Sequence, residues 1–171
     1  MTFLLDATGK VRSNDDFVFY NNRNSPGGAV EHLKDNRTGA GAGDDEIIRI
    51  DLAKVPTEIE KIVFAVSIYE AELRRQNFGM ITSAFIRIVN NVTPGEITKY
   101  DLISPTFHRV LNNVRQNEII RYELSSNAHR DTAVILGELY RHEHDWKFCA
   151  VGQGFAGGFA ALVGSYGVDA N

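Results

Sequence analysis

The sequence predicts an all-β protein, mainly an antiparallel β-sandwich that carries one or two short helices. Short segments of alternating apolar and polar residues recur along the chain, turn-rich spacers separate them, and few stretches have a helical period. A chain of 171 residues with 43% hydrophobic content can fill one core but is short for two. We therefore expect a single domain over residues 1–171.

Six segments show the alternation that is typical of strands: residues 17–20, 47–52, 62–69, 85–89, 134–140 and 146–151. In residues 62–69 the even-numbered positions up to Ile68 are large and apolar, which predicts a half-buried antiparallel strand. A weaker strand signal covers residues 29–33. Two short helices are expected, over residues 71–76 and 157–166, and Gly167 suits the C′ position of the second.

Two motifs near the C-terminus invite a functional interpretation that their context does not support. Residues 141–145 contain His142 and His144, but they lie between two apolar strands and favour a hairpin turn over a transition-metal site. Residues 152–157 match the G-x-G-x-x-G dinucleotide pattern, yet we expect no second parallel strand with its acidic residue after them. These glycines indicate close packing of a strand against a helix.

The clearest candidate site is the segment 35–46, which joins a glycine-rich stretch to four carboxylates: Asp35, Asp44, Asp45 and Glu46. Calcium takes several oxygen ligands in an adaptable shell, whereas zinc or copper would require His or Cys. Adjacent acids repel one another unless a positive charge neutralises them, and Arg37 is the only cation in the segment. The pattern indicates a calcium loop. The alternative is a solvated turn, which uses the same residue types.

An EF-hand is excluded for this segment, although Asp35 and Glu46 fall at its first and last loop positions. The third position is Arg37 and the sixth, where the motif needs glycine, is Ala40. If consecutive strands form hairpins, the segment before Phe17 and the segment 70–77 would meet residues 35–46 at one end of the sandwich. This convergence adds Glu70 to the predicted metal ligands.

Composition limits the other functional classes. The formal net charge of −4 argues against general nucleic-acid binding. The chain has a single cysteine, Cys149, so it cannot form an intrachain disulfide, which is compatible with a reducing cytoplasm. Cys149 lies in an apolar predicted strand, which predicts an unreactive thiol in the core. We find no signal-peptide core, no membrane-spanning run, no nucleophile constellation and no phosphate loop. We therefore expect a non-enzymatic cytoplasmic protein that is not inserted in a membrane.

An internal repeat lies between the fourth and fifth predicted strands. Residues 90–102 resemble residues 112–124, which start 22 residues later, and the two copies share an Asn-Asn-Val start and a Glu-Ile…Tyr-x-Leu frame. This pattern indicates a local tandem duplication, with residues 103–124 as the inserted copy, rather than a solenoid. The second copy would form an extra hairpin or a projecting loop.

Long stretches of the chain resemble the TerD-type tellurium-resistance and stress-response family. They include Asp-Phe-Val-Phe-Tyr at 16–20, Asp-Asn-Arg-Thr-Gly at 35–39, Gly-Asp-Asp-Glu at 43–46, Gln-Asn-Phe-Gly at 76–79, Gly-Glu-Leu-Tyr-Arg-His at 137–142 and Gly-Gln-Gly-Phe-Ala-Gly-Gly at 152–158. The resemblance implies a cytoplasmic β-sandwich that binds Ca2+ through its acidic loops. On that basis the metal ligands are Asp16, Asp35, Asn36, Asp44, Asp45 and Glu46, while Glu70 comes from loop convergence alone.

The resemblance also implies a stress-response module without catalytic activity, which binds calcium, orders a partner-binding surface, and acts with other tellurium-resistance proteins in a membrane-associated complex. Two departures accompany it. Family members begin tens of residues earlier with further strands, so we expect an N-terminally shortened domain with an exposed edge, and the copy over residues 103–124 is extra. The alternative function is a metal-independent scaffold domain with a disabled calcium site. An enzyme acting on oxidised tellurium through Cys149, the single thiol, is a third interpretation.

Overall fold

The computed structural model describes residues 1–35, 46–81, 85–89, 118–123 and 130–169. Strands dominate these residues and pair antiparallel, which confirms the predicted all-β class. Among the described helices none is long and apolar enough to cross a membrane. The repeat copy at 90–102 and the start of the second copy, up to residue 117, lie outside the described residues.

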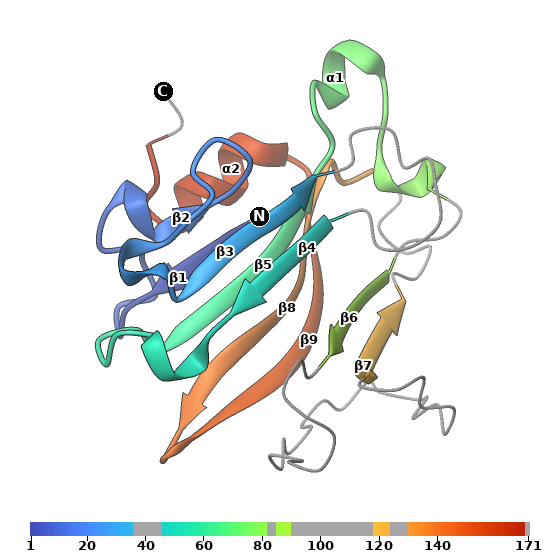
Figure 1. Ribbon diagram of the computed structural model, residues 1–171. Coiled ribbons are helices and arrows are strands. Elements are labelled where there is room, and N and C mark those ends of the chain that lie inside the picture. Colours follow the sequence, from blue (N-terminus) through green and yellow to red (C-terminus); the bar gives the residue numbers. More distant parts are fainter. Residues whose placement is uncertain (36–45, 82–84, 90–117, 124–129, 170–171) are drawn as a thin grey trace.

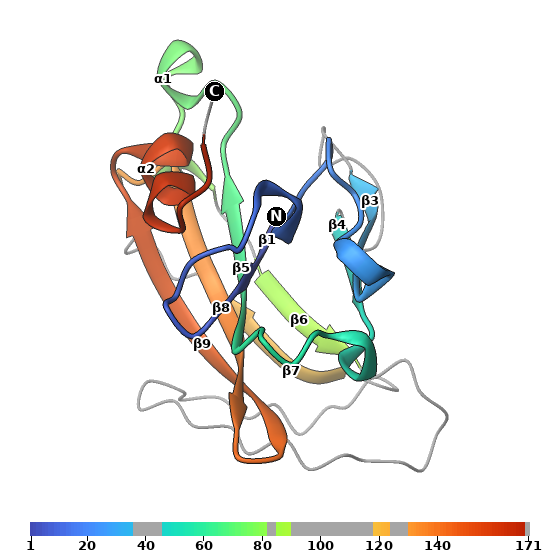
Figure 2. The same ribbon diagram turned by 90° about the vertical axis from the view of Figure 1, so that its left-hand side faces the viewer.

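One five-stranded sheet forms the centre of the molecule, in the order β2-β1-β5-β8-β9. Its strands are β1 (Thr2–Leu5), β2 (Phe17–Val18), β5 (Lys61–Ser67), β8 (Ala133–His142) and β9 (Asp145–Phe155). Two smaller sheets face it: β3 (Val30–Asp35) pairs with β4 (Glu46–Ile50), and β6 (Phe85–Val89) pairs with β7 (Glu118–Glu123). Figure 2 shows these pairs as a second layer against the central sheet, so the architecture is a sandwich.

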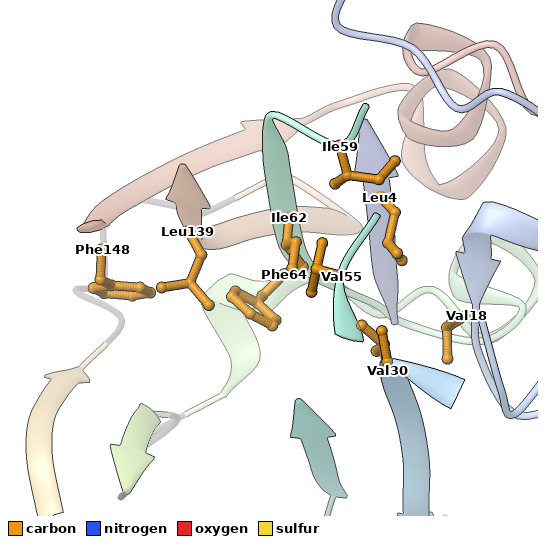
Figure 3. Close-up of a cluster of buried hydrophobic side chains, with 10 residues drawn as sticks. Leu4, Val18, Val30, Val55, Ile59, Ile62, Phe64, Leu139 and Phe148 are labelled. Atoms are coloured by element: carbon orange, nitrogen blue, oxygen red, sulfur yellow. The ribbon is translucent and has the colours of Figure 1, made fainter. Parts of the chain in front are cut away.

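The sandwich core lies between these two layers. The even-numbered residues of β1 and β5, such as Leu4, Ile62 and Phe64, point into it together with Leu139 and Phe148 from β8 and β9 (Figure 3). The second layer contributes Val30 and the half-buried isoleucines of β4 and β6. This arrangement follows from the period of two in a strand, which puts alternate side chains on one face.

A second core lies on the outer face of the central sheet, where helix α2 (Gly158–Ser165) covers it (Figure 2). Phe3, Val63 and Ala65 point toward this helix and are buried beneath Leu162 and Val163. The predicted antiparallel strand in residues 62–69 is confirmed as β5, but the expectation of half-burial is wrong, because residues 62–65 are buried on both faces. The predicted C-terminal helix is confirmed, with Gly167 in the left-handed region at φ 80° just after the cap residue Tyr166.

Several predicted boundaries shift. β2 is shorter than residues 17–20, because Phe19 and Asn22 bond each other's backbones and turn the chain away from the sheet. The weak signal at 29–33 is confirmed as β3. β1 and β7 fall outside the six predicted segments, and β1 is missed because its four residues are all buried and show no alternation. The first predicted helix shortens to α1 (Ala71–Arg74), which projects from one end of the sandwich (Figure 1).

The predicted turn at 141–145 is confirmed as the connection of the β8–β9 hairpin, with His142 paired to Asp145 and Glu143 at φ 57°. The glycines that follow are closely packed, as predicted, but Gly154 and Gly158 approach residues that precede β8 rather than a helix. A Cβ on Gly154 would lie 1.8 Å from a carboxylate oxygen of Asp131, and one on Gly158 would lie 2.6 Å from the hydroxyl of Thr132. The close neighbours are thus the residues that lead into β8.

Candidate functional site

The β3–β4 hairpin carries the two ends of the predicted calcium loop. The register pairs Asp35 with Glu46, so two acidic residues occupy directly opposed positions where the hairpin meets residues 36–45. Like charges at opposed positions of an antiparallel pair destabilise it unless something neutralises them. The predicted ligands Asn36, Asp44 and Asp45 lie outside the described residues, so Glu46 is the loop ligand whose side chain the structure places.

Glu46 lies on the interior face of β4, at the rim of the sandwich. It shares that face with Ile48 and Ile50, which pack against the sandwich core. Its side chain is 43% exposed, as expected for the last position of an inward-facing stripe. Arg49 of the same strand belongs to the other face and pairs there with Glu31 of β3.

His32 of β3 approaches Glu46 from the facing strand. It shares the interior face with Val30 and its backbone is paired with Ile48, two residues from Glu46. A bulge at Leu33 interrupts β3 directly after it. His32 is 5% exposed, and its Nε2 lies 3.7 Å from Oε2 of Glu46. The inward-facing side chains of the β3–β4 hairpin therefore end in the polar pair His32 and Glu46, next to the acidic segment 35–46.

Two buried polar atoms in this region have no hydrogen-bond partner among the described residues: Nδ1 of His32 and Oγ1 of Thr2. Thr2 is fully buried at the start of β1, next to the amino group of Met1. That amino group donates to the carbonyl oxygen of Ala65 at 3.0 Å and lies 3.8 Å from Oε2 of Glu46. Sequence reasoning missed His32 and Thr2, although a histidine in a strand that leads into four acids was a usable signal.

The predicted ligand Glu70 lies at the same end of the molecule as this rim. It lies between β5 and α1, which projects from that end of the sandwich (Figure 1). Ala65, in the same half of β5, accepts the hydrogen bond from the amino group of Met1. Glu70 has a left-handed backbone at φ 49°, and its carbonyl oxygen accepts a bond from Arg74 within α1. No described contact joins its carboxylate to Glu46, so the structure places it nearby without bringing the two together.

The predicted ligand Asp16 lies elsewhere, so the expected three-way convergence of loops is wrong for its segment. Asp16 is 1% exposed, and its carboxylate accepts two hydrogen bonds from the guanidinium of Arg12, at 2.7 and 2.8 Å. Arg12 also lies 3.9 Å from Glu58, which precedes β5, whereas Glu70 follows that strand. Asp16 is already neutralised at the opposite end of the sheet.

Among the described residues the oxygen donor of this site is the carboxylate of Glu46, a ligand of the kind that calcium prefers. The polar neighbours described within 4 Å of that carboxylate are nitrogens, Nε2 of His32 and the amino group of Met1. Within the described part of the chain no three His, Cys, Asp or Glu side chains gather as a metal cluster. A complete calcium shell would thus need the carboxylates of residues 36–45, with Glu46 at their border.

Cys149 is less buried than its apolar strand predicted. It lies opposite Glu138 in the β8–β9 pairing, and Glu138 bonds Lys61 at 2.9 Å. Partial burial raises the pKa of the thiol, and the negative charge of Glu138 adds to this effect. Both effects disfavour the thiolate, which is the nucleophilic form.

Comparison with known proteins finds similarity along almost the whole chain. The model of the TerD domain matches residues 1–107 and 102–166. Tellurium resistance protein TerD of Serratia marcescens is 46% identical over 169 residues, which cover 99% of this chain and 77% of that protein. General stress protein 16U of Bacillus subtilis is 44% identical over 98% of this chain and 75% of its own. Chemical-damaging agent resistance protein B of Clostridium acetobutylicum is 41% identical over 93% of this chain and 99% of its own length.

Proposed function

This chain belongs to the TerD domain family, and we propose that within this group of tellurium-resistance and stress-response proteins it acts as a calcium-binding, non-enzymatic module. The observation that carries the proposal is the opposition of Asp35 and Glu46 at the mouth of an acidic loop. The hairpin holds these two backbone positions opposite each other, and acidic residues at opposed positions would be stabilised by a shared cation.

In this proposal Asp35, Asn36, Asp44, Asp45 and Glu46 hold the ion. Bound calcium would supply the positive charge that cancels the repulsion among these acids. The protein's own part is to fix the two ends of the loop through the β3–β4 pairing and to anchor that hairpin on the core through Val30, Ile48 and Ile50. Asp16 has no part in the site, because Arg12 already occupies its carboxylate.

The same end of the molecule carries a surface suited to a protein partner, with large exposed apolar side chains on and around α1: Tyr69, Leu73, Met80 and Ile81. Leu73 is 80% exposed. The segment is held in place at its base, where the amides of Ile68 and Phe78 donate to the carbonyls of Thr132 and Asp131. Exposed apolar clusters of this kind mark interaction sites, and Tyr and Met are enriched in them.

We propose that calcium orders this end for binding to other tellurium-resistance proteins in a membrane-associated cytoplasmic complex. The paired substitution Leu73→Ser with Met80→Ser should then abolish tellurite resistance in cells while calcium affinity stays unchanged. The matched control is Val151→Ser, which removes an exposed apolar side chain from β9. Equal loss of resistance in the double variant and in the control would show that the surface around α1 is not a specific partner-binding site.

The calcium site is tested by thermal unfolding of the purified chain with calcium, with magnesium and with chelator, followed by calorimetric titration. Calcium at about 100 times its dissociation constant should raise the free energy of unfolding by about 2.7 kcal/mol. Asp44→Asn combined with Asp45→Asn should reduce the gain, and Asp101→Asn is the control outside the loop. A folded chain that neither shifts nor releases heat with calcium would favour a metal-independent scaffold.

A further inference from the structure

We propose that His32 is a positioning residue that holds the carboxylate of Glu46 in place for calcium. The inference rests on the calcium function proposed above and assigns a role to a residue outside the predicted ligand set. It starts from two observations on the described residues: the approach of the imidazole to the carboxylate, and the burial of the imidazole without a partner for its second nitrogen.

The backbone brings the two side chains together. Residues that stand diagonally across an antiparallel pair are within reach of long side chains, and His32 and Glu46 have this relation through Ile48. Both lie on the interior face of the hairpin. The bulge at Leu33 then changes the alternation of β3, so His32 is the last residue of its strand in the regular stripe before the acidic loop.

Packing alone does not account for a histidine at this position. The side chain is almost completely buried, yet Nδ1 has no hydrogen-bond partner among the described residues. A buried polar group without a partner destabilises the fold, and an apolar residue of similar size would avoid that cost. The other nitrogen, Nε2, faces the carboxylate of Glu46 at 3.7 Å. The charged group that the imidazole approaches is thus a proposed calcium ligand.

If the imidazole of His32 carries its hydrogen on Nε2, it can donate a hydrogen bond to Glu46. By donating to one oxygen of Glu46, the ring would restrict the rotamer of this half-exposed side chain and leave its other oxygen for the ion. Metal-ligating carboxylates are commonly held by such outer hydrogen bonds, and removing the donor weakens metal binding about 10- to 100-fold. The amino group of Met1, 3.8 Å from the same oxygen, is a charged neighbour of Glu46.

Calorimetric calcium titration of three variants of the full chain tests the role. His32→Leu keeps the volume but removes the donor, and should weaken calcium binding at least about tenfold. His32→Gln restores an N–H donor at similar reach and should stay within about threefold of the parent chain. His144→Leu, in the exposed β8–β9 turn, is the matched control and should bind as the parent does. Unchanged binding by His32→Leu would overturn the inference.

A spectroscopic measurement adds evidence that a purely structural role would not produce. The 15N shifts of the His32 ring in the calcium-loaded chain should show hydrogen on Nε2, and the Nδ1–H tautomer would refute the assignment. This measurement, with His32→Gln, also carries the test if His32→Leu fails to fold. Failure of the parent chain to bind calcium would refute the proposed function itself, whereas binding that ignores His32 refutes the positioning role alone.

Discussion

Arg12 and Asp16 form a two-point ion pair at the end of the sheet opposite the acidic loop. Nε of Arg12 donates to Oδ2 of Asp16 at 2.7 Å, its terminal nitrogen donates to Oδ1 at 2.8 Å, and the Arg12 backbone amide adds a third bond at 3.2 Å. Bonding to Asp16 raises the pKa of the guanidinium. The pair fixes residues 12–16 against the start of β2, so its role is structural.

Asp16→Ala should therefore lower the free energy of unfolding by about 1–2 kcal/mol, because it removes the three hydrogen bonds that Arg12 donates, while the exposed guanidinium regains water. Asp15→Ala is the control, since Asp15 is exposed and next to it in the chain. Urea denaturation measures both. Calcium titration should give the same affinity in all three chains, and a loss of affinity in Asp16→Ala alone would return Asp16 to the metal site.

Gly137 should tolerate no side chain. A Cβ there would lie 2.5 Å from the ring of Phe148 and 2.9 Å from the carbonyl oxygen of Cys149, in the irregular part of the β8–β9 pairing. We expect Gly137→Ala to cost about 1–3 kcal/mol through overpacking. Gly164→Ala, in α2 with open space around it, should instead gain up to about 1 kcal/mol from helix propensity. Denaturant midpoints that move in the same direction for both variants would contradict these two expectations.

Tyr166 should make the fold sensitive to alkali. Burial raises the pKa of its hydroxyl from the ordinary 10.0 to about 12, and Glu138 adds to the effect. The folded state thus keeps the proton where the unfolded chain loses it. The stability contribution is complete below pH 10 and is lost as the pH rises toward 12.

The measurement for Tyr166 is the thermal midpoint between pH 9 and pH 12 in the parent chain and in Tyr166→Phe. The parent should lose stability more steeply through this window, because phenylalanine has no proton to release. Below pH 10 the two curves should run parallel. Equal slopes throughout would show that the hydroxyl is not protected in the folded state.

Cys149→Ser should leave tellurite resistance intact. The thiol has a raised pKa and lies beside a carboxylate, which are poor conditions for a redox nucleophile. The test is growth on tellurite of cells that express the parent chain or the variant at equal levels. A loss of resistance by a variant that remains folded would support an enzyme acting on oxidised tellurium, and would count against the non-enzymatic proposal.

Local patterns in the sequence were sufficient for much of the fold. The alternation in residues 134–140 and 146–151, with the polar turn between them, predicted the β8–β9 hairpin, and Gly167 marked the end of the C-terminal helix. The acidic segment 35–46 was likewise visible as a unit, and the pairing of Asp35 with Glu46 agrees with it. These features depend on neighbours within a few residues along the chain, which is the range over which side-chain periodicity carries information.

Only the tertiary structure determined which faces of the central sheet are buried and which acidic residues lie close together. The local pattern fits Val63 and Ala65 equally well as exposed or buried residues, and only the docking of α2 from the far end of the chain buries them. Asp16 was assigned to the metal site from the resemblance to the family's motif, but the sheet places its segment at the end away from Glu46, where its carboxylate bonds Arg12, four residues earlier in the chain. His32 became a candidate through a diagonal contact across two strands. Register and layer packing join residues distant in sequence, so a pattern with a period of two cannot encode them.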